Sequence, residues 1–151
     1  MLAHWIWLAH RPVLTDLMKA QILSQYGDPE QVYFEDRFEN VEGLTAQGLS
    51  ALQNKDLTEA HKILSACEEK HLHILTLAEE AYPSRLRQIP DPPLVLYYKG
   101  RLPDFDSTAV IGVVGTRHAT GYGLQAARRL GYQLGKSGAI VVRKKCSHQL
   151  S

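Results

Sequence analysis

Residues suited to holding a phosphate group are gathered between Val110 and Val142. An apolar run ends at Val114, and a loop follows that has glycine at positions 115, 121 and 123 and an arginine at position 117. A periodic segment and a second apolar run come next, as in a strand, loop, helix and strand. Such a loop offers unpaired backbone N–H groups at a helix start, and the planar Arg117 guanidinium can donate two hydrogen bonds to phosphate oxygens. The stretch therefore predicts an anion site.

Two common phosphate-binding loops fit this sequence poorly. A Walker A loop has four residues between its glycines, whereas five separate Gly115 from Gly121, and Tyr122 follows in place of lysine. Residues 121–126 match the G-x-G-x-x-A dinucleotide pattern, but they begin well after the strand. No acidic residue follows Asp106, so the ribose ligand of a dinucleotide site is missing. NAD binding is not favoured, and the small residues could instead let the helix pack closely on a sheet.

Charge is distributed unevenly along the 151 residues, although the net charge is only +1. Residues 1–106 carry 10 Lys or Arg and 16 Asp or Glu, whereas residues 107–151 carry seven basic residues and no acidic one. A basic block of this kind attracts phosphates, although a solvated basic helix face and tail would have the same composition.

Other residue groups give weaker indications. Cys67 and His71 share a helix face and His73 follows, but no fourth metal ligand is evident, so a buried cysteine with exposed histidines is the favoured interpretation. There is no nucleophile elbow and no carboxylate pair on one element, so we expect neither an enzyme nor a cofactor. Four aromatic residues could stack on bases, but we favour a place for them in the core: Trp5, Trp7, Tyr33 and Phe34.

The elements that must position the loop follow from hydrophobic periodicity. From about Trp5 to Lys70 the pattern is helical, with a helix start at Asp28 as N-cap and Pro29 at the first helical position. Further helices are expected at residues 45–52 and 57–70. After a boundary near residues 71–74, the strand candidates LHILTL and LVLYYKG flank a connection rich in proline.

A βαβ unit is predicted to close the chain. Its strands are residues 109–114 and 139–142, its helix is residues 121–137, and Gly138 provides the C-terminal cap. This order implies parallel strands and a right-handed crossover. No run approaches the roughly 20 apolar residues of a membrane span, a signal peptide is not expected, and two cysteines fit a reducing compartment, so we expect a cytoplasmic protein.

The segments IPDPPLVLYYKGRLP and VVGTRHATGYG resemble the DprA/Smf family of DNA-processing proteins. In that family a lead of the type YP..L..I.DPP..LY..G precedes a strand and a G-S/T-R-x-x-T/S-x-Y-G loop. The similarity is dense from Lys55 to Val142 and weaker back to Trp5, so it covers most of the chain.

The resemblance implies a helical SAM-like domain at residues 1–72 and an incomplete extended Rossmann-like parallel sheet at residues 73–142. It implies single-stranded DNA binding and protection in natural transformation and recombination, by a mediator that loads RecA and forms homodimers at full length. Arg117 would contact the DNA backbone, with loop amides and hydroxyls around it. The expected DNA- or phosphate-binding residues are Gly115, Thr116, Arg117, Thr120, Gly121, Tyr122, Gly123 and Arg128.

The sequence departs from the family pattern at two places. Family members often carry hairpin glycines near the N-terminus, whereas HRPVLTDLMKA has none, so we assign the helical domain to packing or partner contacts. After Val142 the family continues into a motif of the type SG.A.GID, whereas this chain has the basic segment RKKCSHQLS, residues 143–151.

From these departures we expect a truncated or frameshifted member with a less stable α/β part and steeply weakened DNA affinity. The alternative is a small Rossmann-type protein that binds a nucleotide phosphate.

Overall fold

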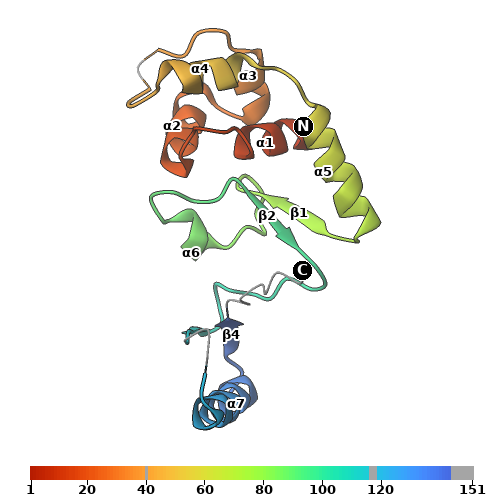
Figure 1. Ribbon diagram of the computed structural model, residues 1–151, viewed down its shortest axis with the longest axis vertical. Coiled ribbons are helices and arrows are strands. Elements are labelled where there is room, and N and C mark those ends of the chain that lie inside the picture. The colour runs from red at the N-terminus through yellow and green to blue at the C-terminus, as the bar shows by residue number, and fades with distance from the viewer. Residues whose placement is uncertain (40, 116–118, 144–151) are drawn as a thin grey trace. The chain divides into compact units, whose positions relative to one another are not determined.

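The computed structural model describes residues 1–39, 41–115 and 119–143 of the chain. The chain forms two compact units, Met1–Leu102 and Pro103–Ser151 (Figure 1). None of the described helices is long and apolar enough to cross a membrane. The combination of helices and strands confirms a mixed α and β fold.

Five helices open the first unit: α1 Leu2–Ala9, α2 Asp16–Tyr26, α3 Pro29–Phe34, α4 Ala46–Gln53 and α5 Thr58–Glu69. The starts of α2, α3 and α4 have side-chain caps, from Thr15, Asp28 and Thr45. The Asp28 carboxylate accepts hydrogen bonds from the amides of Glu30 (2.7 Å) and Gln31 (3.2 Å), with Pro29 at the first helical position. The predicted start of α3 is therefore confirmed, and helices are present at the other predicted places; α1 begins earlier than expected, at Leu2.

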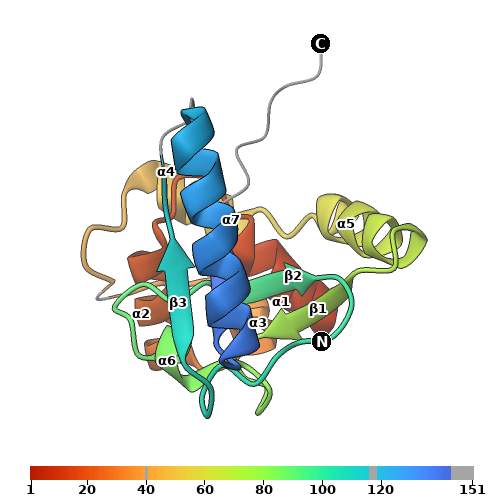
Figure 2. The ribbon, with the colours of Figure 1, turned by 90° about the horizontal axis from the view of Figure 1, so that it is seen from below.

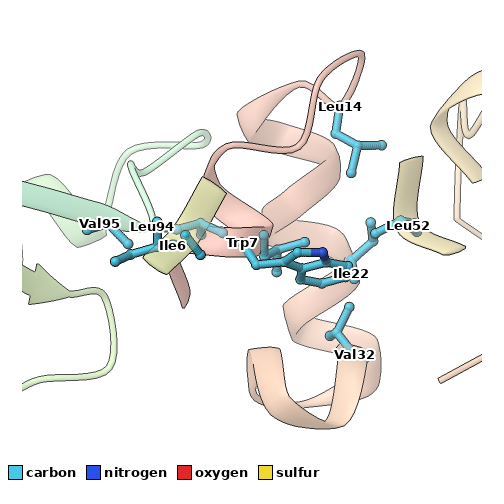
Figure 3. Close-up of a cluster of buried hydrophobic side chains, with 10 residues drawn as sticks. Ile6, Trp7, Leu14, Ile22, Val32, Leu52, Leu94 and Val95 are labelled. Carbon is cyan, nitrogen blue, oxygen red and sulfur yellow. The ribbon is translucent and has the colours of Figure 1, made fainter. Parts of the chain in front are cut away.

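The core of this unit is built around α1, which contacts α2, α3 and α5 (Figure 1). Trp7 is 1% exposed, and its indole Nε1 donates a hydrogen bond to the Asn54 carbonyl at 3.0 Å, so its polar group is satisfied. Trp7 confirms the predicted core role, whereas Phe34 is 71% exposed and the prediction was wrong for it. Figure 3 shows side chains of this cluster meeting from several elements: Ile6, Trp7, Leu14, Ile22, Val32, Leu52, Leu94 and Val95.

A β-hairpin completes the first unit. Strands β1 His73–Thr76 and β2 Val95–Tyr98 pair antiparallel, with the short helix α6 Ser84–Arg87 in the connection between them. Tyr82 is buried in this connection, and its hydroxyl donates a hydrogen bond to the Pro93 carbonyl at 2.9 Å. The proline-rich motif therefore holds Leu94 and Val95 against the helices. Both strands belong to the first compact unit, and the domain boundary at residues 72–73 stays a prediction.

The second unit contains β3 Val110–Val113, α7 Gly121–Lys136 and β4 Ile140–Arg143. β3 and β4 pair in parallel, from Val110 beside Ile140 to Val113 beside Arg143, as predicted for a βαβ unit. Figure 2 shows α7 running opposite to β3, as a crossover helix must. The described strands thus form two separate two-stranded sheets, of which the β3–β4 sheet has the expected parallel pairing.

The C-terminal end of α7 is closed by the glycine that the sequence indicated. Gly138 has φ +84°, in the region that favours glycine. The Gly138 amide bonds the Gly135 carbonyl at 3.1 Å, and the Ala139 amide bonds the Leu134 carbonyl at 3.1 Å. These two bonds form a Schellman motif, which ends the helix and turns the chain into β4.

Burial differs sharply between the two units. Between residues 103 and 142, none of the residues that the structure describes is buried. Val114, for example, is 92% exposed and Leu124 is 50% exposed. The second unit therefore has the backbone arrangement of a βαβ unit, but its described residues do not form a buried hydrophobic core.

Candidate nucleic-acid interface

The candidate site is the connection from β3 to α7. β3 ends at Val113, Gly115 is exposed, and α7 begins at Gly121. Thr116 and Arg117 lie outside the described residues. The described part of the connection is therefore Gly115, Ala119 and Thr120, which lead into the first turn of α7.

Thr120 is the N-cap of α7. Its side-chain oxygen accepts a hydrogen bond from the Gly123 amide at 3.2 Å, and its carbonyl accepts one from the Leu124 amide at 3.0 Å. A hydroxyl that accepts a bond in this way can still donate its own hydrogen. The arrangement fixes the direction of the first helical turn and leaves the Thr120 O–H able to meet an anion.

Two backbone donors remain at this helix start. The amides of Gly121 and Tyr122 form no hydrogen bond with any other described residue. Unpaired amides at the start of a 16-residue helix, together with the helix dipole, favour an anion at this place.

Glycine at positions 115 and 121 is required neither by packing nor by a left-handed backbone. A Cβ atom built on Gly115 or Gly121 would meet no described atom within 4 Å, and neither has a positive φ. At Gly123, by contrast, a Cβ would lie 3.4 Å from the Thr120 hydroxyl oxygen. The open space beside Gly115 and Gly121 is available for close approach of a ligand.

The arginine pair of α7 divides between two sides of the helix. Arg128 is exposed, but six residues from Tyr122 it points to a different face, because each residue advances the helix by about 100°. Arg129 instead lines a shallow hollow together with Tyr122. Arg128, and not Arg129, is among the binding residues predicted from the sequence; a helical projection of residues 121–136 would have identified Arg129.

Among the described residues, no carboxylate forms an ion pair with the cations of α7. Arg128, Arg129 and Lys136 lie on a helix without Asp or Glu, and none of the three has an ion pair within the described ranges. A negatively charged ligand would therefore meet uncompensated positive charge along α7.

The basic residues near the turn between α1 and α2 serve the fold instead. The Arg11 guanidinium lies 5.0 Å from the Trp7 ring centroid and donates hydrogen bonds to the carbonyls of Trp7, Ala51 and Asn54. Lys19 is 6% exposed and donates from Nζ to the Ala9 carbonyl at 2.7 Å. Both side chains are engaged within the unit, as expected for a packing role.

The metal interpretation gains no support from the part of the chain that is described. Cys67 is buried, whereas His71 and His73 are exposed, and His73 stacks on Tyr98 with ring centroids 4.9 Å apart. Among the described residues, no group of three or more His, Cys, Asp or Glu side chains could hold a metal ion.

Comparison with known proteins finds a family that part of this chain resembles. The sequence model of the family described as DNA recombination-mediator protein A matches residues 73–143. The DNA processing protein DprA of Bacillus subtilis is 33% identical over 81 residues, which are 54% of this chain and 27% of that protein. Protein Smf of Synechocystis is 39% identical over 84 residues, covering 54% of this chain and 21% of that protein.

A third relative extends the similarity into the helical unit. Protein Smf of Borreliella burgdorferi is 30% identical over 114 residues, which are 70% of this chain and 36% of that protein. The chain thus matches roughly a fifth to a third of the length of these curated relatives. The family match over β1 to β4, together with relatives named DprA and Smf, supports the assignment of this chain to the DprA/Smf family.

Proposed function

We propose that this chain binds single-stranded DNA through the loop between β3 and α7. The observation that carries the proposal is a capped helix start with the exposed glycines 115 and 121 beside it, in a segment with seven basic residues and no acidic residue. A polyanion with accessible phosphates suits such a surface. The relatives' names, DNA processing protein and recombination mediator, supply the cellular setting.

The proposed contacts divide between backbone and side chains. The amides of Gly121 and Tyr122 would donate hydrogen bonds to phosphate oxygens. Gly115, which has no side chain, would allow the DNA strand to come close to the loop. Arg117, with two parallel donors, would hold the backbone, and the hydroxyls of Thr116 and Thr120 would add further donors. Phosphate contacts of this kind position a strand without reading its sequence.

The proposed role is binding, without catalysis or a cofactor. By its family we propose that the chain acts in recombination and natural transformation, protecting single-stranded DNA and passing it to RecA in the cytoplasm. Homodimer formation is part of the same proposal for the full-length family members.

Fluorescence anisotropy of a labelled oligo-dT tests the proposal. We expect wild-type binding to weaken log-linearly with salt, because counterions are released from the strand. Arg117→Ala should cost about 1.5–3 kcal/mol, the usual contribution of hydrogen bonds to a charged group. Arg37→Ala is the matched control, because Arg37 is an exposed arginine of the first unit.

Two results would contradict the proposal. One is a folded wild-type protein that leaves the anisotropy unchanged at low salt. The other is an equal loss in Arg37→Ala and Arg117→Ala, which would show attraction by net charge alone. A free mononucleotide that displaces oligo-dT at low concentration would favour the nucleotide-phosphate alternative, whose binding depends less on salt.

A further inference from the structure

One face of α7 combines aromatic and basic side chains in a continuous row. The half-buried positions Gly123, Gly131 and Leu134 mark the side of the helix that packs on the sheet, where α7 contacts β4. By helical geometry the opposite side carries six polar or aromatic residues, which we call the α7 stripe. They are Tyr122, Gln125, Arg129, Tyr132, Gln133 and Lys136.

The α7 stripe is hollowed along its length. One shallow hollow is lined by Tyr122, Gln125, Ala126, Arg129, Leu130 and Gln133. A second is lined by Arg129, Tyr132, Gln133, Lys136 and Ser137. Because Arg129 and Gln133 line both, the two hollows are neighbours, and each holds one tyrosine and at least one cation.

The two tyrosines of the α7 stripe are largely exposed to solvent. Tyr122 is 82% exposed and Tyr132 is 72% exposed, and neither hydroxyl has a hydrogen-bond partner within the described residues. Tyrosine is a weaker helix former than the Lys, Gln and Arg beside it, so helix stability does not explain these residues. Surfaces that stack on nucleic-acid bases typically have exposed aromatic rings beside guanidinium and amide groups, as these tyrosines are.

We propose that the α7 stripe is a base-stacking track for single-stranded nucleic acid, leading away from the phosphate-binding loop. Tyr122, the second residue of α7, stacks the first base beyond the loop, and Tyr132 stacks a base about 15 Å further along the axis, from a rise of ~1.5 Å per residue. Arg129 lies between them and neutralises the intervening phosphates. This inference rests on the proposed single-stranded DNA binding and extends it to Arg129, Tyr132 and Lys136.

Charge and chemistry favour a nucleic acid over a protein as the occupant. The charged residues of α7 are three cations, and none is paired within the described part of the chain. A second copy that presented its own α7 stripe would bring the same positive surface to the contact and be repelled. A single strand supplies both a negative backbone and bases with a π face, and stacking tolerates any base sequence.

The test separates base stacking from phosphate attraction. Wild type, Tyr132→Leu and Tyr132→Phe of the 151-residue chain are titrated against oligo-dT and against an abasic oligomer of equal length. We expect Tyr132→Leu to weaken oligo-dT binding about 5- to 150-fold, the effect of one lost aromatic stack, and to leave abasic binding unchanged. Tyr132→Phe keeps the ring and should bind both probes as wild type does.

Two further variants test the second tyrosine and the arginine of the α7 stripe. Tyr122→Leu should show the same selective loss, and Arg129→Gln should weaken both probes and reduce the salt slope by about one. Circular dichroism checks that each variant keeps its helices.

Each contrary outcome has its own meaning. Binding that Arg117→Ala abolishes and Tyr132→Leu leaves intact would overturn the stacking track alone. A folded wild type that binds neither probe would overturn the track and the proposed function together. A dimer in sedimentation velocity that Tyr132→Leu dissociates, without selective loss on oligo-dT, would make the stripe a contact between copies.

Discussion

Val13 adopts a backbone conformation that a β-branched residue rarely takes. Its φ is +70°, in the turn between α1 and α2, and its side chain is 56% exposed. The left-handed region costs a non-glycine residue about 1–3 kcal/mol, and an exposed side chain recovers little of this by burial. The turn therefore stores strain that glycine would remove.

Replacing Val13 with glycine should stabilise the protein. We expect Val13→Gly to raise the free energy of unfolding by about 1 kcal/mol, after the greater flexibility of glycine in the unfolded chain is subtracted. Val13→Ala, which keeps a Cβ atom, should gain less. Urea denaturation measures both changes, and a loss of stability in Val13→Gly would show that the side chain contributes more than its strain costs.

His4 makes the first unit sensitive to acid. The imidazole is 7% exposed, its Nδ1 has no hydrogen-bond partner among the described residues, and the Tyr33 ring lies 4.6 Å away. Burial, followed by the N-terminal ammonium, lowers the pKa of His4 below its ordinary value of 6.5, although Glu30 and Asp28 act in the opposite direction.

The folded protein should lose stability as the pH falls through the ordinary histidine pKa. Because the pKa of His4 is lower in the folded state, the unfolded state binds more protons in this pH range. The unfolded population therefore grows as the pH falls. We expect the urea midpoint to fall between about pH 7.5 and about pH 5.5, and His4→Asn to reduce that fall. His10, whose pKa burial also lowers, leaves a residual slope. An identical pH slope in His4→Asn would exclude His4 as a source.

Among the secondary-structure elements, the end of α7 offers a matched pair of glycines. Gly138 has a positive φ and closes the Schellman motif, whereas Gly135 lies within the helix, and a Cβ on either would meet no described atom within 4 Å. Replacing either glycine with alanine therefore tests its backbone conformation, because the added methyl group meets no described neighbour at either position.

Alanine should have opposite effects at these two positions. We expect Gly138→Ala to destabilise α7 by about 1–2 kcal/mol, because an L-residue disfavours the left-handed region. Gly135→Ala should stabilise the helix by about 0.5–1 kcal/mol. Hydrogen exchange of the α7 amides measures both, and slower exchange in Gly138→Ala would contradict the role of the cap.

Local signals predicted many of the elements and some of their caps. Asp28, Pro29 and Gly138 lie where the sequence placed them, because capping depends on neighbouring residues alone. α6 lies within a connection expected to be irregular, and sequence periodicity does not determine which strands pair, so the antiparallel β1–β2 sheet was not anticipated. α7 begins at Gly121, as expected, whereas the binding residues stay a prediction. Arg129 is recognised only when the residues of α7 are assigned to faces of the helix.

For the molecule as a whole, stability should differ between the two units. The first is organised around the buried Trp7, whereas none of the described residues from 103 to 142 is buried. A two-stranded parallel sheet with one helix removes little apolar surface from water and leaves both strand edges open.

Hydrogen exchange followed by mass spectrometry should show this difference directly. We expect peptides from α1 and α5 to be protected and peptides from α7 and β4 to exchange much faster, because local opening there exposes little new surface. Oligo-dT should slow exchange in α7 if the strand binds there. Equal protection of α1 and α7 in the free protein would show that the second unit is covered, for example by self-association.

The place of the tryptophans decides what an optical experiment on this protein reports. The chain has two, Trp5 and Trp7, and both lie in α1. Intrinsic tryptophan emission therefore follows the melting of the first unit and is silent about the loop and α7. Tyr122 and Tyr132 are the natural reporters of the second unit, so a strand that stacks on them would quench tyrosine emission while the tryptophan spectrum stays the same.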